Sequence, residues 1–82
     1  MSIEMGIRDF IAGELSWDGS PEDLDLDYPL LEREVVDSLG IFKIISFLET
    51  EYDIEIDDEE LIPENFESIS KIAGLVAAKT GV

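Results

Sequence analysis

The chain contains neither cysteine nor histidine. Without cysteine there is no disulfide framework, no thiolate nucleophile and no cysteine metal site, which suits a cytosolic protein. Without histidine, a serine hydrolase would lack the base that usually takes the proton of its hydroxyl group. The carboxylates are scattered over polar positions, and no pattern places one in an apolar pocket. We therefore expect no enzymatic activity and no catalytic residue.

Long apolar runs are also missing. No stretch approaches the roughly 20 residues that a membrane-spanning helix needs. The segment MSIEMGIRDF carries Glu4, Arg8 and Asp9 among its apolar positions and has no basic start, so a signal peptide is not expected. We predict a cytoplasmic protein that does not bind membranes.

Positive charge is scarce. Five Lys and Arg residues stand against 21 Asp and Glu residues, so the formal net charge is −16. Such a surface repels nucleic acids and anionic membranes and favours partners with basic patches. The alternative is that the charge serves only solubility.

Apolar residues, by contrast, are sufficient for one small core. The 82 residues fit one domain, expected to span 1–82, and a hydrophobic content of 45% is too high for a disordered acidic tail. Helical spacing dominates and strand alternation is nearly absent. We predict an all-α fold, a small antiparallel bundle of three main helices and one short helix, with a long loop between the first two.

The first and last helices are predicted from their apolar stripes. The first should run from Ile3 to Leu15, with Ser2 as N-cap, and the last from Ser68 as N-cap to about Lys79. A short helical turn is predicted at 57–61, ended by Pro63. The stripe of the first helix is Ile3, Ile7, Phe10, Ile11 and Leu15. The stripe of the last is Ile69, Ile72, Ala73 and Val76.

The connection from Ser16 to Asp37 is rich in turn residues and aspartate. Loops longer than about 12–15 residues are uncommon in compact domains and are often functional. We expect this one to be ordered, because apolar residues can attach it to the core. They are Trp17, Leu24, Leu26, Tyr28, Leu30, Leu31, Val35 and Val36.

The acidic residues of this connection match an EF-hand loop only in part. Asp23, Asp25, Asp27 and Glu34 fit ligand positions, but Tyr28 stands where the sharp turn needs glycine. The proline that follows Tyr28 also favours extended backbone there. We predict no EF-hand calcium site and assign no metal ligand, while weak divalent binding to the acidic cluster stays an alternative.

The second helix is predicted from near Ser38 to near Tyr52. Its buried stripe is Ile41, Ile44, Ile45, Leu48 and Tyr52. Leu39 and Phe47 fall off this stripe, and Phe42 lies on its edge. Two interpretations stay open for Leu39 and Phe47: contact with a neighbouring helix or loop, or an exposed apolar docking spot beside Ser38.

Ser38 itself has two explanations. Either Ser38 or Asp37 is the N-cap of the second helix, and in both cases the hydroxyl group lies near the positive end of a helix. A phosphate attached there would meet unpaired backbone N–H groups. The position therefore suits a serine that receives a phosphate-linked group from another enzyme, with simple capping as the alternative.

The tripeptide Asp37-Ser38-Leu39, opening an amphipathic helix, resembles the acyl and peptidyl carrier protein family. Leu31 and Val36 match the apolar positions that lead into the motif. The segments GIFKIISFLETEYDIEI (40–56) and DDEELIPENFESISKIAGLV (57–76) resemble the later helices of the family. The strong similarity covers about residues 30–76.

The resemblance implies a carrier function. A phosphopantetheinyl transferase would use coenzyme A and a divalent metal to attach 4'-phosphopantetheine to Ser38. The arm would hold an acyl or aminoacyl group as a thioester in fatty-acid-like, polyketide or other specialised biosynthesis. Partners would be the transferase, a loading enzyme and acyl-processing enzymes, and the protein would be a monomer. Recognition residues would be Asp37, Leu39, Phe42, Lys43, Phe47 and Glu49.

Some residues depart from the family pattern. Val35 and Val36 stand where a glycine is common, Lys43 takes a position that is often acidic in fatty-acid carriers, and Phe47 replaces a smaller residue. These departures favour a discrete carrier of a specialised pathway, including pathways that charge carriers with amino acids. The alternative function is a non-catalytic acidic interaction module with the carrier fold and no prosthetic arm.

Overall fold

The computed structural model describes residues 3–15, 17 and 19–81. Its helices are α1 (Ile3–Glu14), α2 (Ser38–Tyr52) and α3 (Ile69–Thr80). Three short 3₁₀ turns accompany them: η1 (Pro21–Asp23), η2 (Asp58–Glu60) and η3 (Pro63–Phe66). No strand occurs among the described residues. The predicted all-α bundle is thus confirmed.

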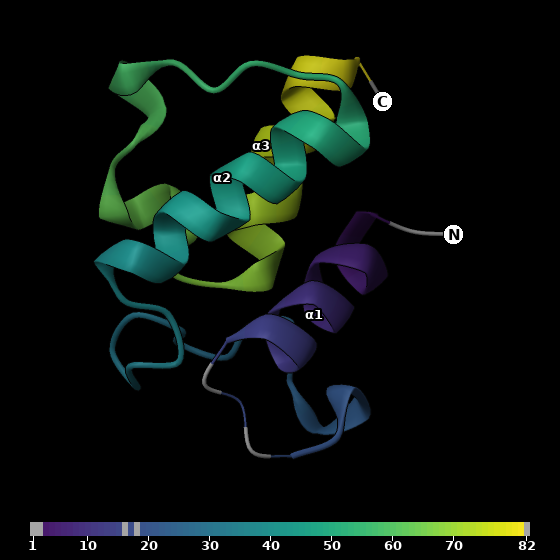
Figure 1. Ribbon diagram of the computed structural model, residues 1–82, viewed down its shortest axis with the longest axis vertical. Helices are drawn as coiled ribbons and strands as arrows, with labels where there is room; N and C mark the ends of the chain where they lie inside the picture. Colours follow the sequence, from purple (N-terminus) through teal and green to yellow (C-terminus); the bar gives the residue numbers. More distant parts are fainter. Residues whose placement is uncertain (1–2, 16, 18, 82) are drawn as a thin grey trace.

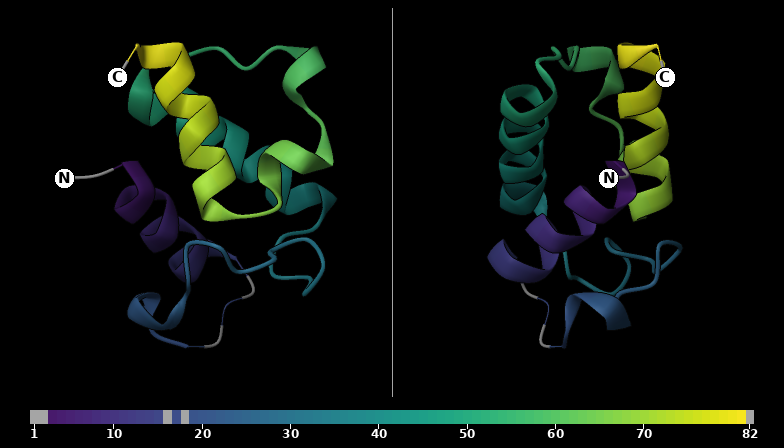
Figure 2. Two further views of the ribbon diagram at one scale, coloured as in Figure 1. Left: turned by 180° about the vertical axis from the view of Figure 1, so that it is seen from behind. Right: turned by 90° about the vertical axis from the view of Figure 1, so that its right-hand side faces the viewer.

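The helices form a small bundle in which α2 and α3 lie side by side and α1 crosses them (Figure 1). α2 and α3 run in the same general direction, because the segment between them returns along the length of the bundle, while α1 runs the opposite way (Figure 2). The connection from α1 to α2 packs at the end of the bundle where α2 begins. This end also holds Ser38.

The core is built from the stripes that the sequence predicts. Ile7 and Ile11 of α1 and Ile44 and Leu48 of α2 have no solvent exposure, and the outer members of both stripes pack against them. The four apolar residues predicted to be buried in α3 are all buried. Helical periodicity alone was enough to predict these buried residues, because one face of each helix packs against the same core. The predicted N-cap Ser2 lies outside the described residues.

The described part of the connection before α2, residues 17 and 19–37, is ordered, as predicted. Leu24, Leu30, Val35 and Val36 are buried in the core. The backbone adds to this attachment, because the Leu30 N–H donates to the carbonyl oxygen of Glu67 at 2.8 Å. The long loop is therefore part of the packed structure and holds the start of α2 in place.

The segment between α2 and α3 contains more local structure than the single short turn that was predicted. η2 matches that turn, but Pro63 also opens η3. Proline fits the first position of a helical turn because its missing N–H is not needed there. α3 then begins as predicted, since the Ser68 hydroxyl oxygen accepts a hydrogen bond from the Lys71 N–H at 3.2 Å.

In the part of the chain that the structure describes, every helix is too short or too polar to pass through a bilayer.

Candidate functional site

Ser38 is the first residue of α2, and its neighbour Asp37 is the N-cap. The Asp37 Oδ1 atom accepts a hydrogen bond from the Gly40 N–H at 2.8 Å. Because Asp37 performs the capping, the Ser38 hydroxyl is not needed for it, and Ser38 is exposed to solvent. The alternative in which Ser38 is the cap is thereby excluded.

Close packing beneath Ser38 fixes its outward direction. Val35 and Val36, just before the cap, are buried, and so is Gly40. A Cβ atom on Gly40 would lie 3.3 Å from both Asp37 Oδ1 and Val36 Cγ1. Glycine at this position therefore lets the connection press closely against α2. The inward-facing positions are occupied, and the serine is left on the surface.

The environment of Ser38 fits a phosphate-linked group. Within the described chain, the backbone N–H groups of Ser38 and Leu39 have no hydrogen-bond acceptor. Such groups at a helix N-terminus, together with the helix dipole, favour an anion. The Asp37 carboxylate is a negative charge at the same place, so the fit depends on these N–H groups rather than on nearby cations.

Apolar side chains surround Ser38 on the surface. A shallow hollow of about 210 Å³ is lined by Ser38, Ile41, Phe42 and Leu61. Leu39 is 72% exposed and Phe42 is 63% exposed. Leu61 and the exposed Ile62 come from the segment after α2, far from Ser38 in sequence. The sequence did not indicate these two residues, because no periodic pattern links them to the start of α2.

The six predicted recognition residues divide into two groups. Asp37, Leu39, Phe42 and Lys43 are exposed near the start of α2. Phe47 is half-buried and stacks on Phe10 with ring centroids 4.3 Å apart. Glu49 is half-buried, and its Oε2 atom accepts a hydrogen bond from the Ile56 N–H at 3.0 Å.

The sequence left two interpretations open for Leu39 and Phe47, contact with a neighbouring element or exposure beside Ser38, and the structure gives a different answer for each residue. Phe47 contacts a neighbouring helix, and Leu39 is an exposed apolar residue beside Ser38. Partner recognition by any of the six residues stays a prediction. The internal contacts of Phe47 and Glu49 give these two residues a structural role in addition.

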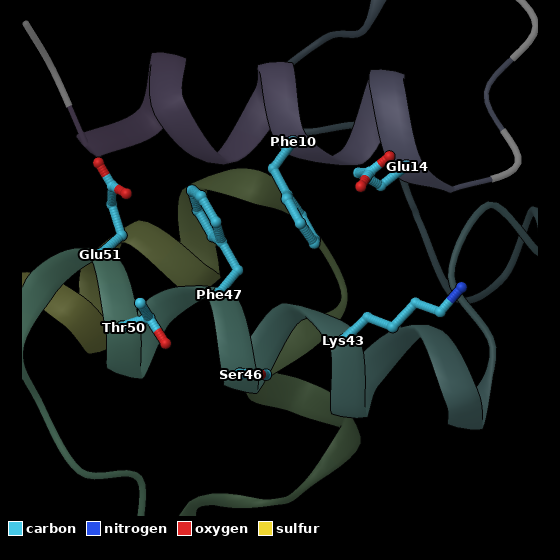
Figure 3. A pocket seen from close by; sticks show the side chains of 7 residues that line it. All are labelled: Phe10, Glu14, Lys43, Ser46, Phe47, Thr50 and Glu51. Atoms are coloured by element: carbon cyan, nitrogen blue, oxygen red, sulfur yellow. The ribbon is translucent and has the colours of Figure 1, made fainter.

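A groove runs between α1 and α2, as Figure 3 shows. Phe10 and Phe47 point toward each other across it, Glu14 lies on the α1 side, and Lys43 projects from α2. The groove is open to solvent, with a volume of about 460 Å³, and Ser46, Thr50 and Glu51 complete its lining. It contains no cluster suited to catalysis. Within the described residues, moreover, no group of three potential metal ligands comes together.

Comparison with known proteins gives a consistent result at the level of sequence. The sequence model of the family described as "Phosphopantetheine attachment site" matches residues 6–76. The chain is 37% identical over 59 residues to the probable acyl carrier protein PigG of Serratia sp. (strain ATCC 39006). That alignment covers 72% of this chain and 68% of PigG.

Solved structures give the same result at the level of fold. A structure of KstB-PCP in its apo form matches with a TM-score of 0.77 and 39% identity, over 90% of this chain and 81% of that one. A chain from a structure described as "Crystal structure of FAD-dependent dehydrogenase" matches with a TM-score of 0.74 and 33% identity. The second match covers 85% of this chain and 97% of the other.

Proposed function

Since this chain belongs to the phosphopantetheine-attachment family of carrier proteins, we propose that Ser38 is the residue that receives the prosthetic group. The family sets the general function: the chain is a non-catalytic carrier, and its covalent cofactor is 4'-phosphopantetheine. The resemblance identified from the sequence is confirmed. Attachment to Ser38, the pathway and the cargo are the proposed part.

One observation carries the assignment to Ser38. Its hydroxyl group is exposed at the first position of α2, and Asp37 has taken over the capping role. Ser46 is also exposed on α2, but it lies well inside the helix, where backbone N–H groups are already paired. Ser38 therefore offers both an accessible oxygen and unpaired donors for the phosphate.

The bound group supplies a terminal thiol that holds an acyl or aminoacyl group as a thioester. The protein's own residues contribute the rest. Asp37 fixes the helix start, the unpaired N–H groups of Ser38 and Leu39 would be available to donate to the phosphate, and exposed side chains around Ser38 are available to partner enzymes. The tether keeps the carried group at a high local concentration for those enzymes.

The cargo is proposed as an acyl or aminoacyl group of a fatty-acid-like, polyketide or other specialised pathway. One relative is named as an acyl carrier protein and one solved structure as a PCP, which supports both kinds of cargo. We propose as partners a phosphopantetheinyl transferase, a loading enzyme and downstream acyl-processing enzymes. We also propose that the chain acts as one domain over 1–82, as a monomer and in the cytoplasm.

Intact-protein mass spectrometry tests this function. With coenzyme A, magnesium and a broad-specificity transferase, the wild type should gain the mass of one phosphopantetheine. Ser38→Ala should gain nothing, while Ser46→Ala, which removes another exposed hydroxyl from the same helix, should react like the wild type. Modification of Ser38→Ala would overturn the assignment.

The same assay separates the carrier from its alternative. An acidic interaction module that keeps the carrier fold without an arm would leave the wild type unmodified with every transferase tried. Protein expressed in a bacterial host would then show a single apo mass. A mixture of apo and holo masses instead supports the carrier.

A further inference from the structure

Gly40 is a buried glycine in the first turn of α2, two residues after the proposed attachment residue Ser38. Among the described residues, Gly81 is the glycine with a positive φ angle, so the backbone of Gly40 has a conformation that other residues also adopt. Glycine is less favourable than alanine inside a helix, because it loses more conformational freedom on folding. The sequence therefore places a poor helix former where the backbone does not require it, and the reason lies in the space around it.

Three segments of the chain meet at this glycine. A Cβ atom at position 40 would lie 3.3 Å from Asp37 Oδ1, 3.3 Å from Val36 Cγ1 and 3.6 Å from Leu15 Cδ2. The first two distances are shorter than ordinary van der Waals contact. Leu15 follows α1, Val36 belongs to the connection, and Asp37 caps α2. The missing side chain therefore lets all three segments close on the first turn of α2, and a side chain there would displace at least one of them.

One of the two closest atoms belongs to the cap of the helix. The Gly40 N–H donates to Asp37 Oδ1 at 2.8 Å, so a Cβ atom on the same residue competes for the space that this oxygen occupies. Among the described residues, the other carboxylate oxygen, Asp37 Oδ2, has no hydrogen-bond or ion-pair partner. The carboxylate is thus fixed through one oxygen, while the other stays available on the residue beside the exposed Ser38.

We propose that Gly40 is a positioning residue for the transfer of phosphopantetheine to Ser38, because its missing side chain allows the Asp37 carboxylate to keep its place beside the Ser38 hydroxyl. This proposal rests on the carrier function proposed above and adds a residue to that reaction. Gly40 is buried and offers only its backbone N–H, so it acts through Asp37. A methyl group at position 40 removes no side chain that a transferase could contact, yet it displaces the carboxylate relative to the hydroxyl.

The transfer reaction is sensitive to such a displacement. The Ser38 Oγ atom forms a bond to the phosphorus of the phosphopantetheine, the pyrophosphate bond of coenzyme A breaks, and adenosine bisphosphate leaves. The hydroxyl proton passes to a base of the transferase. Phosphoryl transfer needs the attacking and leaving oxygens roughly in line, and a misplacement of about 1 Å can cost about 100-fold in rate. A smaller shift at the cap should therefore slow the chemical step and leave binding of the chain by the transferase largely unchanged.

The test compares the full-length wild type with Gly40→Ala and Gly74→Ala. Gly74 is the matched control, because it lies inside α3, is exposed, and a Cβ atom there would meet no neighbouring segment within 4 Å. Both variants replace a helical glycine by alanine, so they share the same gain in helix propensity. The values of kcat and KM are measured with coenzyme A, magnesium and a broad-specificity phosphopantetheinyl transferase. Amide hydrogen exchange at residue 40, corrected for the intrinsic rate, reports on the cap independently of the transferase.

We expect Gly40→Ala to lower kcat about tenfold, with a KM within about twofold of the wild-type value. The amide of residue 40 should exchange at least about tenfold faster, because its acceptor has moved, while the amides of α3 keep their wild-type rates. Gly74→Ala should match the wild type in kcat and KM. A purely structural defect would differ from this pattern, because partial unfolding lowers the concentration of folded carrier, which raises the apparent KM and leaves kcat unchanged.

Three results would overturn the proposal. The first is a wild-type kcat for Gly40→Ala, which would show that transfer tolerates a side chain at this position. The second is a loss confined to KM together with a lower melting temperature, which would limit Gly40 to a role in stability. The third is a lower kcat with the amide of residue 40 still protected, which would show that Gly40 does not act through Asp37.

A second variant keeps the test decisive if Gly40→Ala fails to fold. Val36→Ala/Gly40→Ala removes one of the two closest atoms and keeps the contact with Asp37 Oδ1, so kcat should again fall with little change in KM. A wild-type kcat for this double variant would contradict the proposal. In each of these outcomes the wild type is still modified, so the carrier function stands. A wild type that no transferase modifies would instead contradict the carrier function itself.

Discussion

Asp37 shows how one residue serves both the fold and the proposed site. Its Oδ1 atom caps α2 through the Gly40 N–H, and its backbone carbonyl accepts the Ile41 N–H. We propose that it also has a second role, in recognition by the transferase. The two roles depend on different properties, because capping needs an oxygen acceptor and recognition of a metal-dependent enzyme needs the negative charge.

Replacing Asp37 by asparagine separates these roles. Asparagine caps helices about as well as aspartate, so Asp37→Asn should change the free energy of unfolding by less than about 0.5 kcal/mol. Asp37→Ala removes the acceptor and should cost about 1 kcal/mol. Urea unfolding followed by circular dichroism measures both values.

Phosphopantetheine transfer provides the second readout. If the charge of Asp37 is used in recognition, both variants should react more slowly than the wild type, although only Asp37→Ala is less stable. A normal rate for Asp37→Asn would limit Asp37 to its capping role. A large loss of stability in Asp37→Asn would contradict the capping argument instead.

Single residues also show where prediction from sequence stops. Glu34 and Asp53 adopt positive φ angles of 61° and 53°, although neither is a glycine. Aspartate tolerates left-handed backbone better than glutamate does, so Asp53 fits its place at the end of α2, whereas nothing in the identity of Glu34 indicates its angle. Phe47 was equally ambiguous, since helical spacing places it on the side of α2 without revealing that Phe10 faces it.

At the scale of elements, the local signals were reliable. The bounds of α2 follow from a cap at one end and a left-handed residue, Asp53, at the other. The start of α3 follows from Ser68. These signals act within a few residues, so a single sequence reveals them. The segment between α2 and α3 was harder, because its shape depends on contacts with the distant end of α3.

Lys79 is the residue that makes this contact. Its Nζ atom lies 2.6 Å from Glu60 Oε1 and 3.9 Å from Asp57 Oδ2, which joins the last turn of α3 to η2. The sequence indicated only that a cation suits the end of a helix. The hydrogen bond from Lys79, followed by that from the Asp57 N–H, holds the pKa of the Glu60 carboxyl below its usual value of 4.5. The same bond with Glu60 raises the pKa of Lys79 above 10.5.

These shifts fix the pH range in which the ion pair stabilises the fold. Glu60 has a lowered pKa, so its contribution is present above 4.5 and is lost as the pH falls through the folded-state value. Lys79 has a raised pKa, so its contribution is present below 10.5 and is lost as the pH rises through the folded-state value. The stabilisation is therefore complete at neutral pH.

The variant Lys79→Met should accordingly melt below the wild type at pH 7. The difference should shrink as the pH falls through the folded-state pKa of Glu60, because the carboxyl then becomes protonated in both proteins. Lys71→Met is the matched control, since it removes an exposed lysine of α3 that has no ion pair with a described residue. A difference between Lys79→Met and the wild type that stays constant through the acid titration of Glu60 would show that packing of the lysine stem, and not the ion pair, is responsible.

At the scale of the whole molecule, the fold was easier to predict than the complete site. Three apolar stripes and one hydrophobic core leave few arrangements for a chain of this length, and the radius of gyration of 11.5 Å is close to the ~12 Å expected for a folded chain. Ser38 could be proposed as the attachment residue from the sequence, because Asp37, Ser38 and Leu39 are consecutive in the chain. Leu61 and Ile62 were not found, because only the fold brings their segment to the start of α2.

The net charge has a consequence for the stability of the whole chain. The charge of −16 is confined to a particle with dimensions of 31 × 27 × 19 Å. These dimensions are similar to the Debye length of about 30 Å at 0.01 M salt and exceed the length of about 10 Å at 0.1 M salt. At low salt the acids therefore repel each other across the whole fold, and unfolding relieves this repulsion.

We expect the melting temperature at pH 7 to rise as NaCl is increased from about 0.02 to 0.5 M, because screening weakens the repulsion in the folded state. If screening recovers about 1 kcal/mol, a chain of this size should gain roughly 4–8 °C. Differential scanning calorimetry measures the rise, and MgCl₂ at matched ionic strength is the control for specific binding.

Equal effects of NaCl and MgCl₂ on the melting temperature support general repulsion among the acids. A much larger effect of MgCl₂ would assign the stabilisation to divalent binding by particular acids, and a melting temperature that falls with NaCl would show that attractive pairs such as Lys79–Glu60 outweigh the repulsion.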